Sequence, residues 1–193
     1  MTVADRAARA FRRRFDADPA TTVSAPGRVN LVGGHTEYND GYVLPMGVDR
    51  RTAVAACPRT DDGLRVHSAT VGETATVDGD PRGDWTDYLA GVRWALRDAG
   101  HAVGGADLAV ASDVPAGAGL FSSAALEMTT CRALDRIGDL GLDGPTAARC
   151  CTHAENEFVG CPAACSTATP RRVRWPTARW NSTVGRWRRD PHR

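Results

Sequence analysis

A polar run near the N-terminus has the residue types of a polyol-binding segment. The sequence APGRVNLVGGHTEYNDGYVLP covers residues 25–45 and carries Arg28, Asn30, His35, Glu37, Asn39 and Asp40. Sugar hydroxyls need hydrogen-bond donors and acceptors at fixed positions, and these side chains supply both. The run therefore predicts a loop that binds a polyol, with a solvent-exposed turn as the alternative.

A second segment, PAGAGLFSS at residues 115–123, is typical of a phosphate-binding loop. Gly117 and Gly119 allow the backbone to approach a ligand closely, and Ser122 and Ser123 place hydroxyls where a helix begins. Free N–H groups and the helix dipole favour an anion there. A tight turn with serine as the helix N-cap is the alternative. The run matches neither a complete Rossmann fingerprint nor a Walker A loop, which requires a lysine that this chain lacks.

Helices and strands in irregular order surround these two segments. Apolar residues at helical spacing predict helices over residues 3–15, 85–99 and 144–160, and another that follows the phosphate loop from residue 122. Apolar and β-branched runs predict strands at 50–59, 64–70 and 106–112, and short extended segments around a Pro-Gly turn within 21–34. Because the elements do not alternate strictly, we expect an α+β domain, a two-layer mixed sheet with packed helices.

Composition argues against several classes of protein. No apolar run reaches the roughly 18 residues that a membrane span needs, and acids interrupt the N-terminal helix, so we expect a cytoplasmic protein without a membrane partner. The six cysteines lack paired CxxC spacing, which argues against a disulfide or metal framework. All 24 basic residues are arginine, and eight of them lie in residues 161–193. A basic tail would ordinarily suggest a nucleic-acid partner.

Three segments together resemble one family, the GHMP kinases, and within it the galactokinases. The stretch PGRVNLVGGHTEYNDGYVLPM looks like the galactokinase signature, VPAGAGLFSSAALE like the family's phosphate-binding loop, and AENEFVG (154–160) like the segment before its catalytic aspartate. Their order and spacing agree with the family over about residues 3–160. The resemblance implies a GHMP kinase N-terminal lobe at residues 1–160, with the C-terminal lobe missing.

The resemblance also implies a reaction, transfer of the γ-phosphoryl group of MgATP to the anomeric hydroxyl of galactose. Phosphoryl transfer asks a protein mainly to position its reactants and to neutralise charge. By the match, Arg28 is the catalytic residue beside the reacting hydroxyl and the transferring phosphate, a role that its permanent charge suits. His35, Glu37 and Asn39 fall on sugar-binding positions.

Nucleotide and metal contacts follow from the same resemblance. The residues that would cradle the ATP phosphates are Gly117, Gly119, Ser122 and Ser123. Ser123 and Glu155 would bind Mg²⁺, a hard cation held by few protein oxygens. An exposed helical charge is the alternative for Glu155. We therefore expect ATP and Mg²⁺ as cofactors, galactose as the sugar, a monomer, and no nucleic-acid partner.

The sequence departs from the galactokinase pattern at three positions. Where galactokinases usually read Glu-His-Thr-Asp, this chain reads Gly34-His35-Thr36-Glu37, so one carboxylate is missing and another reaches one methylene further. Phe121 replaces a residue that is usually small or hydroxylated. Sugar phosphorylation remains the expected reaction, and the preferred sugar stays open.

Residues 161–193 do not continue the family pattern. In the family, AENEFVG leads into a segment like V-P-C-G-V-M-D-Q, whose aspartate is the general base or electrostatic anchor for the sugar hydroxyl. Here the chain reads CPAACSTATPRR. Its degenerate codons, read from the third base, can encode Pro, Cys, Gly, Val or Met, Leu or Phe, and then Asp. We interpret residues 161–193 as a frameshifted, disordered tail, and we expect the chain as written to have no measurable kinase activity.

Two other functions fit part of the sequence. A non-catalytic sensor protein would bind galactose and ATP through the same segments without turnover. A nucleic-acid-binding module would use the arginines and tryptophans of the tail, since aromatic rings among cations can hold single strands. Binding without turnover would identify the sensor, and salt-dependent binding that requires residues 161–193 would identify the nucleic-acid module.

Overall fold

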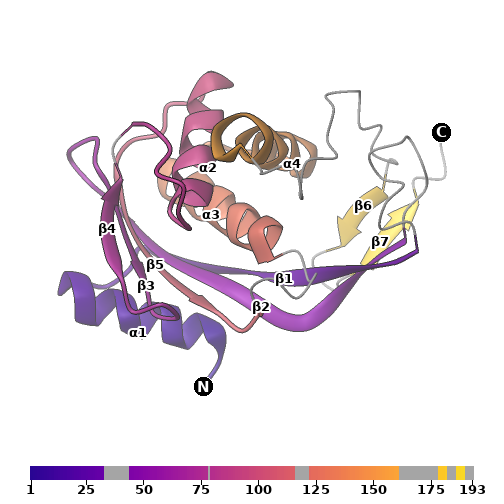
Figure 1. Cartoon of the computed structure of the whole chain (residues 1–193), viewed down its shortest axis with the longest axis horizontal. Coiled ribbons are helices and arrows are strands. Elements are labelled where there is room, and N and C mark those ends of the chain that lie inside the picture. The colour runs from indigo at the N-terminus through magenta and orange to yellow at the C-terminus, as the bar shows by residue number, and fades with distance from the viewer. Residues whose placement is uncertain (33–43, 78, 116–121, 161–177, 182–185, 190–193) are drawn as a thin grey trace.

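Four α-helices, a π-helical turn and a five-stranded sheet make up most of the part of the chain that the structure describes (Figure 1). The structure is a computed structural model that describes residues 1–32, 44–77, 79–115, 122–160, 178–181 and 186–189. The helices are α1 (Val3–Phe15), α2 (Asp87–Asp98), α3 (Ser122–Gly138), α4 (Gly144–His153) and the π-helix η1 (Ala154–Val159). The strands are β1 (Thr21–Val32), β2 (Leu44–Pro58), β3 (Leu64–Ser68), β4 (Thr74–Val77), β5 (Ala106–Ser112), β6 (Ala178–Asn181) and β7 (Arg186–Arg189).

The five-stranded sheet is mixed, with strand order β1-β2-β5-β3-β4. Strands β3 and β5 run parallel, whereas the other neighbours pair antiparallel. The helical segment α2 follows β4 and returns the chain to β5, which lies in the middle of the sheet. The predicted α+β class with a mixed sheet and packed helices is therefore confirmed.

Helices cover both faces of the sheet because the central strands alternate apolar side chains between them. On β5, Leu108 and Val110 point into the core formed with α2, α3 and α4. The intervening residues Ala109 and Ala111 pack under α1, together with Phe11 of that helix. Figure 1 shows α1 on one side of the sheet and the other helices on the opposite side. Helix α1 therefore forms a third layer, in addition to the two layers that the sequence predicts.

The ends of the helices follow local capping rules. Thr2 and Asp5 form a capping box at the start of α1, in which each side chain accepts a backbone N–H of the other residue. The Asp143 side chain caps α4 by accepting the Thr146 N–H at 2.8 Å. Gly100 follows α2 with φ of 87°, a left-handed conformation that glycine adopts without strain. The predicted helices at 3–15 and 85–99 are confirmed to within two residues.

Two strand predictions need correction. The Pro-Gly pair is not a turn, because Pro26 lies within the continuous strand β1, where pairing with β2 shifts register between Pro26 and Arg28. Proline lacks an N–H donor, but β1 is an edge strand, and a proline is tolerated at an edge or a bulge. The short edge strand β4 was not predicted, since TATV has only four residues.

The C-terminal part contains an antiparallel strand pair, β6 and β7. The rest of residues 161–193 lies outside the described residues, so the disordered tail stays a prediction. Across the described part, none of the helices combines the length and the apolar character needed to cross a membrane.

Candidate functional site

The strand that leads into the predicted phosphate loop is fixed at its C-terminal end. The hydroxyl oxygens of Thr52 and Ser112 lie 2.8 Å apart between β2 and β5, and the Val114 N–H donates to Ser112 Oγ at 3.1 Å. Arg6 of α1 donates to the Ser112 carbonyl at 2.9 Å and forms an ion pair with Asp113 at 2.7 Å. The chain therefore leaves the sheet at a defined point, and α3 begins at Ser122 after the loop.

Ser123 and Glu155, the residues predicted to bind Mg²⁺, contact each other. Ser123 lies in the first turn of α3, and its hydroxyl donates to Oε1 of Glu155 at 3.0 Å. Glu155 is half-buried in η1. Since 32 residues separate the two positions in sequence, it is the packing of α3 against α4, the helix that continues into η1, that brings them together.

Close packing of α2 against η1 sets the position of Glu155. A Cβ atom added to Gly91 of α2 would lie 3.1 Å from Cδ1 of Phe158, so the missing side chain allows η1 to approach closely. The Trp94 ring lies 5.7 Å from the Phe158 ring and stacks on His153 at 4.8 Å, centroid to centroid. π-Helical turns occur frequently at functional sites, and here the turn carries the carboxylate that Ser123 contacts.

Glu127 is a buried carboxyl that the sequence analysis did not single out. It lies on α3 one turn after Ser123 and is 1% exposed. No described residue forms a hydrogen bond with its Oε1 atom. Burial, and then the negative charge of Glu155, raise the pKa of Glu127 to about 9. The sequence held one signal of its burial, because Glu127 lies four residues after Ser123 on a helix rich in small and apolar residues.

Arg28, the predicted catalytic residue, is half-buried in β1. It pairs with Gly47 of β2 beside the register shift. Helix α3 packs against both strands, which places the strand of Arg28 next to the helix that begins with Ser122. The remaining predicted residues lie outside the described part of the chain: His35, Glu37, Asn39, Gly117 and Gly119.

The donor set of this site fits a hard divalent cation. Ser123 and Glu155 supply oxygen atoms, and Mg²⁺ prefers oxygen ligands and commonly takes only one or two protein carboxylates, with phosphate and water filling the other positions. Within the described residues no cluster of three or more His, Cys, Asp or Glu side chains is suited to a metal. The α3–η1 group instead combines one hydroxyl with the carboxyls of Glu127 and Glu155.

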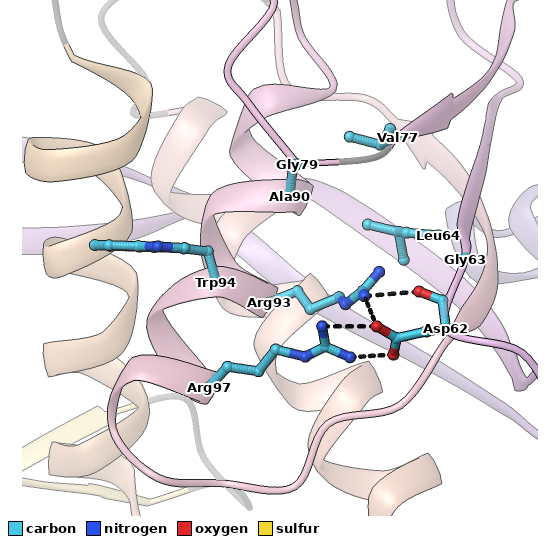
Figure 2. Close-up of a pocket in the computed structure, with 9 residues that line it drawn as sticks. All are labelled: Asp62, Gly63, Leu64, Val77, Gly79, Ala90, Arg93, Trp94 and Arg97. Atoms are coloured by element: carbon cyan, nitrogen blue, oxygen red, sulfur yellow. Dashed lines mark hydrogen bonds and ion pairs between the residues drawn. The ribbon is translucent and has the colours of Figure 1, made fainter.

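A cavity of about 510 Å³ lies elsewhere, between α2 and strands β3 and β4. Figure 2 shows Arg93 and Arg97 pointing toward Asp62 at its edge. Arg93 donates to the Asp62 carbonyl at 2.7 Å, and Arg97 donates to both Asp62 carboxylate oxygens and to the Val103 carbonyl. These interactions already neutralise much of the charge of the two arginines. None of the predicted site residues lines this cavity, so the candidate chemistry lies at the α3–η1 contact.

Family models match two parts of the chain. Residues 9–58 match the galactokinase galactose-binding signature, and residues 87–168 match the GHMP kinase N-terminal domain. Together with the mixed sheet and its helices, these matches show that the chain contains a GHMP kinase N-terminal domain.

Two curated relatives of the chain are galactokinases. The galactokinase of Streptomyces coelicolor is 50% identical over 159 residues, which cover 79% of this chain and 41% of the relative. That of Roseiflexus sp. (strain RS-1) is 46% identical over 154 residues, covering 78% of this chain and 39% of the relative. The chain thus spans about two fifths of the length of these relatives.

Solved structures agree with this family. Lactococcus lactis galactokinase complexed with galactose matches with a TM-score of 0.73 and 28% identity, over 81% of this chain and 42% of that one. Methanococcus jannaschii mevalonate kinase matches with a TM-score of 0.65, covering 77% of this chain and 50% of that one. The second match is 18% identical and shows the shared fold alone.

Proposed function

We propose that this chain forms the N-terminal part of a galactokinase-type sugar kinase. The reaction is transfer of the γ-phosphoryl group of ATP to the anomeric hydroxyl of galactose. The observation that supports it most directly is the 3.0 Å contact between Ser123 and Glu155, in a fold whose relatives are galactokinases. This contact joins the helix after the predicted phosphate loop to a carboxylate suited to Mg²⁺.

In this proposal the start of α3 binds the nucleotide. The phosphate loop and Ser122 lie at the N-terminal end of α3, where free N–H groups and the helix dipole attract phosphate oxygens. Ser123 and Glu155 would hold Mg²⁺, which when bound neutralises negative charge on the transferring phosphate. The permanent charge of Arg28 stabilises the same developing charge beside the sugar hydroxyl. His35, Glu37 and Asn39 orient the sugar by hydrogen bonds.

A chimaeric enzyme tests this function. Residues 1–160 are joined to the remaining part of the Streptomyces coelicolor galactokinase, and galactose-dependent ADP release is measured by a coupled assay. We expect turnover by the chimaera and none by the 193-residue chain. Arg28→Ala in the chimaera should reduce the rate at least about 100-fold, as removal of one transition-state charge partner typically does. Arg51→Ala is the control, because Arg51 lies on the same strand pair and its side chain bonds to Ser24, which is not a predicted site residue.

The chimaera also separates the kinase from the sensor alternative. A folded chimaera that binds galactose and ATP by calorimetry but releases no ADP would support a non-catalytic sensor. A near-normal rate in Arg28→Ala would show that Arg28 is not the catalytic residue. Either result is independent of which sugar is preferred, provided that a panel of aldoses accompanies galactose.

We further propose that residues 161–193 are an out-of-frame translation. The support is the alternative reading of the codons after Gly160, which restores a family-like Pro-Cys-Gly segment followed by an aspartate. Resequencing of the gene from the codon for Val159 onward for several hundred bases tests this. One inserted or deleted base that opens a long reading frame is the expected result, whereas confirmation of the present frame would overturn the proposal.

A further inference from the structure

Polar side chains form a row between α3 and the α4–η1 segment. On α3 the row contains Ser123, Glu127 and Cys131, spaced four residues apart and therefore on one face of the helix. On the opposite side it contains Glu155 and Cys151, again four residues apart. Ser123 bonds to Glu155 at one end of the row, and Cys131 and Cys151 are both buried in the same core cluster at the other. Glu127 lies between these two ends.

The middle position of this row is energetically unusual. Glu127 is 1% exposed, and its Oε1 has no hydrogen-bond partner among the described residues. A buried polar atom without a partner typically costs about 1–3 kcal/mol, and more if it is charged. The described charge that acts on Glu127 is the carboxylate of Glu155, which has the same sign. A cation that binds between two neighbouring carboxyls stabilises both of them.

We propose that Glu127 is an additional oxygen donor of the divalent-cation site, which binds the ion from the buried side of the Ser123–Glu155 pair. This inference rests on the proposed function, because that proposal places the cation at Ser123 and Glu155. Glu127 lies one helical turn further along the same face of α3 and is buried, whereas Ser123 and Glu155 are half-buried. A bound ion would neutralise charge on both carboxyls, and the unpartnered Oε1 atom of Glu127 would serve as one of its ligands.

Binding of Mn²⁺, a stand-in for Mg²⁺, tests the inference without any measurement of turnover. The electron paramagnetic resonance signal of free Mn²⁺ is followed as the 193-residue chain is added, for the wild type and four variants. Ser123→Ala and Glu155→Gln remove the ligands of the proposed function. Glu127→Gln removes the inferred donor while keeping side-chain size. Glu157→Gln is the matched control, because Glu157 lies on the same π-turn but is exposed.

The pattern of affinities distinguishes the two proposals. We expect Glu127→Gln to weaken Mn²⁺ binding about 10-fold or more, the loss usual for a residue that supports a metal site, with Glu157→Gln unchanged. If Ser123→Ala and Glu155→Gln lose affinity while Glu127→Gln binds like the wild type, the role of Glu127 is overturned and the cation site stands. If the wild type does not bind Mn²⁺, or if no variant differs from it, the cation site itself is overturned.

A second measurement on the unmutated chain covers the case in which Glu127→Gln fails to fold. Paramagnetic Mn²⁺ broadens carbon resonances of carboxyls that lie next to it. We expect the side-chain carboxyl resonances of Glu127 and Glu155 to broaden at substoichiometric Mn²⁺, with that of Glu157 still sharp. A Glu127 resonance that stays sharp while that of Glu155 broadens would overturn the inference.

Discussion

Replacing Gly105 by alanine is expected to destabilise the domain, because the new methyl group would meet backbone atoms. A Cβ at Gly105 would lie 2.1 Å from the carbonyl oxygen of Asp61 and 2.7 Å from that of Gly63. Rotation of a side chain cannot relieve contacts with backbone atoms. The same loop is also bonded to the start of β5, since the Arg59 N–H donates to the Gly105 carbonyl at 2.9 Å and the Ala106 N–H donates to the Gly63 carbonyl at 3.0 Å.

The magnitude follows from these contacts. Overpacking that forces the backbone to move costs about 1–3 kcal/mol, and each weakened hydrogen bond adds about 1 kcal/mol. We therefore expect the free energy of unfolding to fall by about 3 kcal/mol for Gly105→Ala. For a chain of this size, each kcal/mol lowers Tm by about 2–4 °C, which gives a decrease of about 6–12 °C. Thermal and urea unfolding followed by circular dichroism measure this change.

The neighbouring glycine provides the matched control. A Cβ at Gly104 would meet no atom within 4 Å, and Gly104 is exposed. We expect Gly104→Ala to change the free energy of unfolding by less than about 0.5 kcal/mol. Equal melting temperatures for Gly104→Ala and Gly105→Ala would refute the reasoning that the Asp61–Gly63 loop packs directly against the backbone at Gly105.

Two further predictions concern the pH dependence of stability. Although burial opposes the change, hydrogen bonds from Arg65 and Arg59 lower the pKa of Asp107, so its contribution is present above about pH 4 and is lost as the pH falls through the folded-state value. Asp107→Asn should therefore make the free energy of unfolding depend less on pH below about pH 4. The same pH dependence in both proteins would contradict this. Glu127 has its pKa raised from 4.5 to about 9, so in the cation-free chain it favours folding at low pH, and this contribution is lost as the pH rises. In the wild type the free energy of unfolding should therefore fall by about 1 kcal/mol per pH unit between these two pKa values, and Glu127→Gln should remove this fall. Urea titrations at several pH values measure it, and the same slope in both proteins would show that Glu127 does not titrate in this range.

Local patterns were sufficient to predict the elements with a clear period. Helix α1 has apolar residues at helical spacing, among them Val3, Ala7 and Phe11, and the structure buries all three. Strand β5 is a short and nearly continuous apolar run, the pattern typical of a strand that is buried on both faces, as the structure shows it to be. Strand β1 was misjudged because a Pro-Gly pair usually marks a turn, and only the position of β1 at the sheet edge permits Pro26 within it.

The candidate site depends on contacts that local sequence patterns do not contain. Ser123 and Glu155 were chosen by resemblance to a family, and their 3.0 Å contact arises from the packing of α3 against α4, the helix that continues into η1. The π-helical turn was predicted as ordinary helix, because its wider hydrogen-bond pattern has no simple residue signature. Glu127 was overlooked because an acid on a helix is usually exposed, and its burial becomes visible only once α3 is placed on the sheet.

Two independent packing features position the two sides of this site, α3 and η1. They explain how the fold can keep two carboxyls partly or fully buried there. On one side, hydrogen bonds at Ser112 fix the end of β5 before the chain reaches α3. On the other, the absence of a side chain at Gly91 lets Phe158 and η1 approach α2. Neither feature involves the carboxyls themselves, so the apolar core supplies the free energy that keeps Glu127 and Glu155 close. A rigid scaffold that holds two carboxyls close together is the arrangement expected where a cation completes the site.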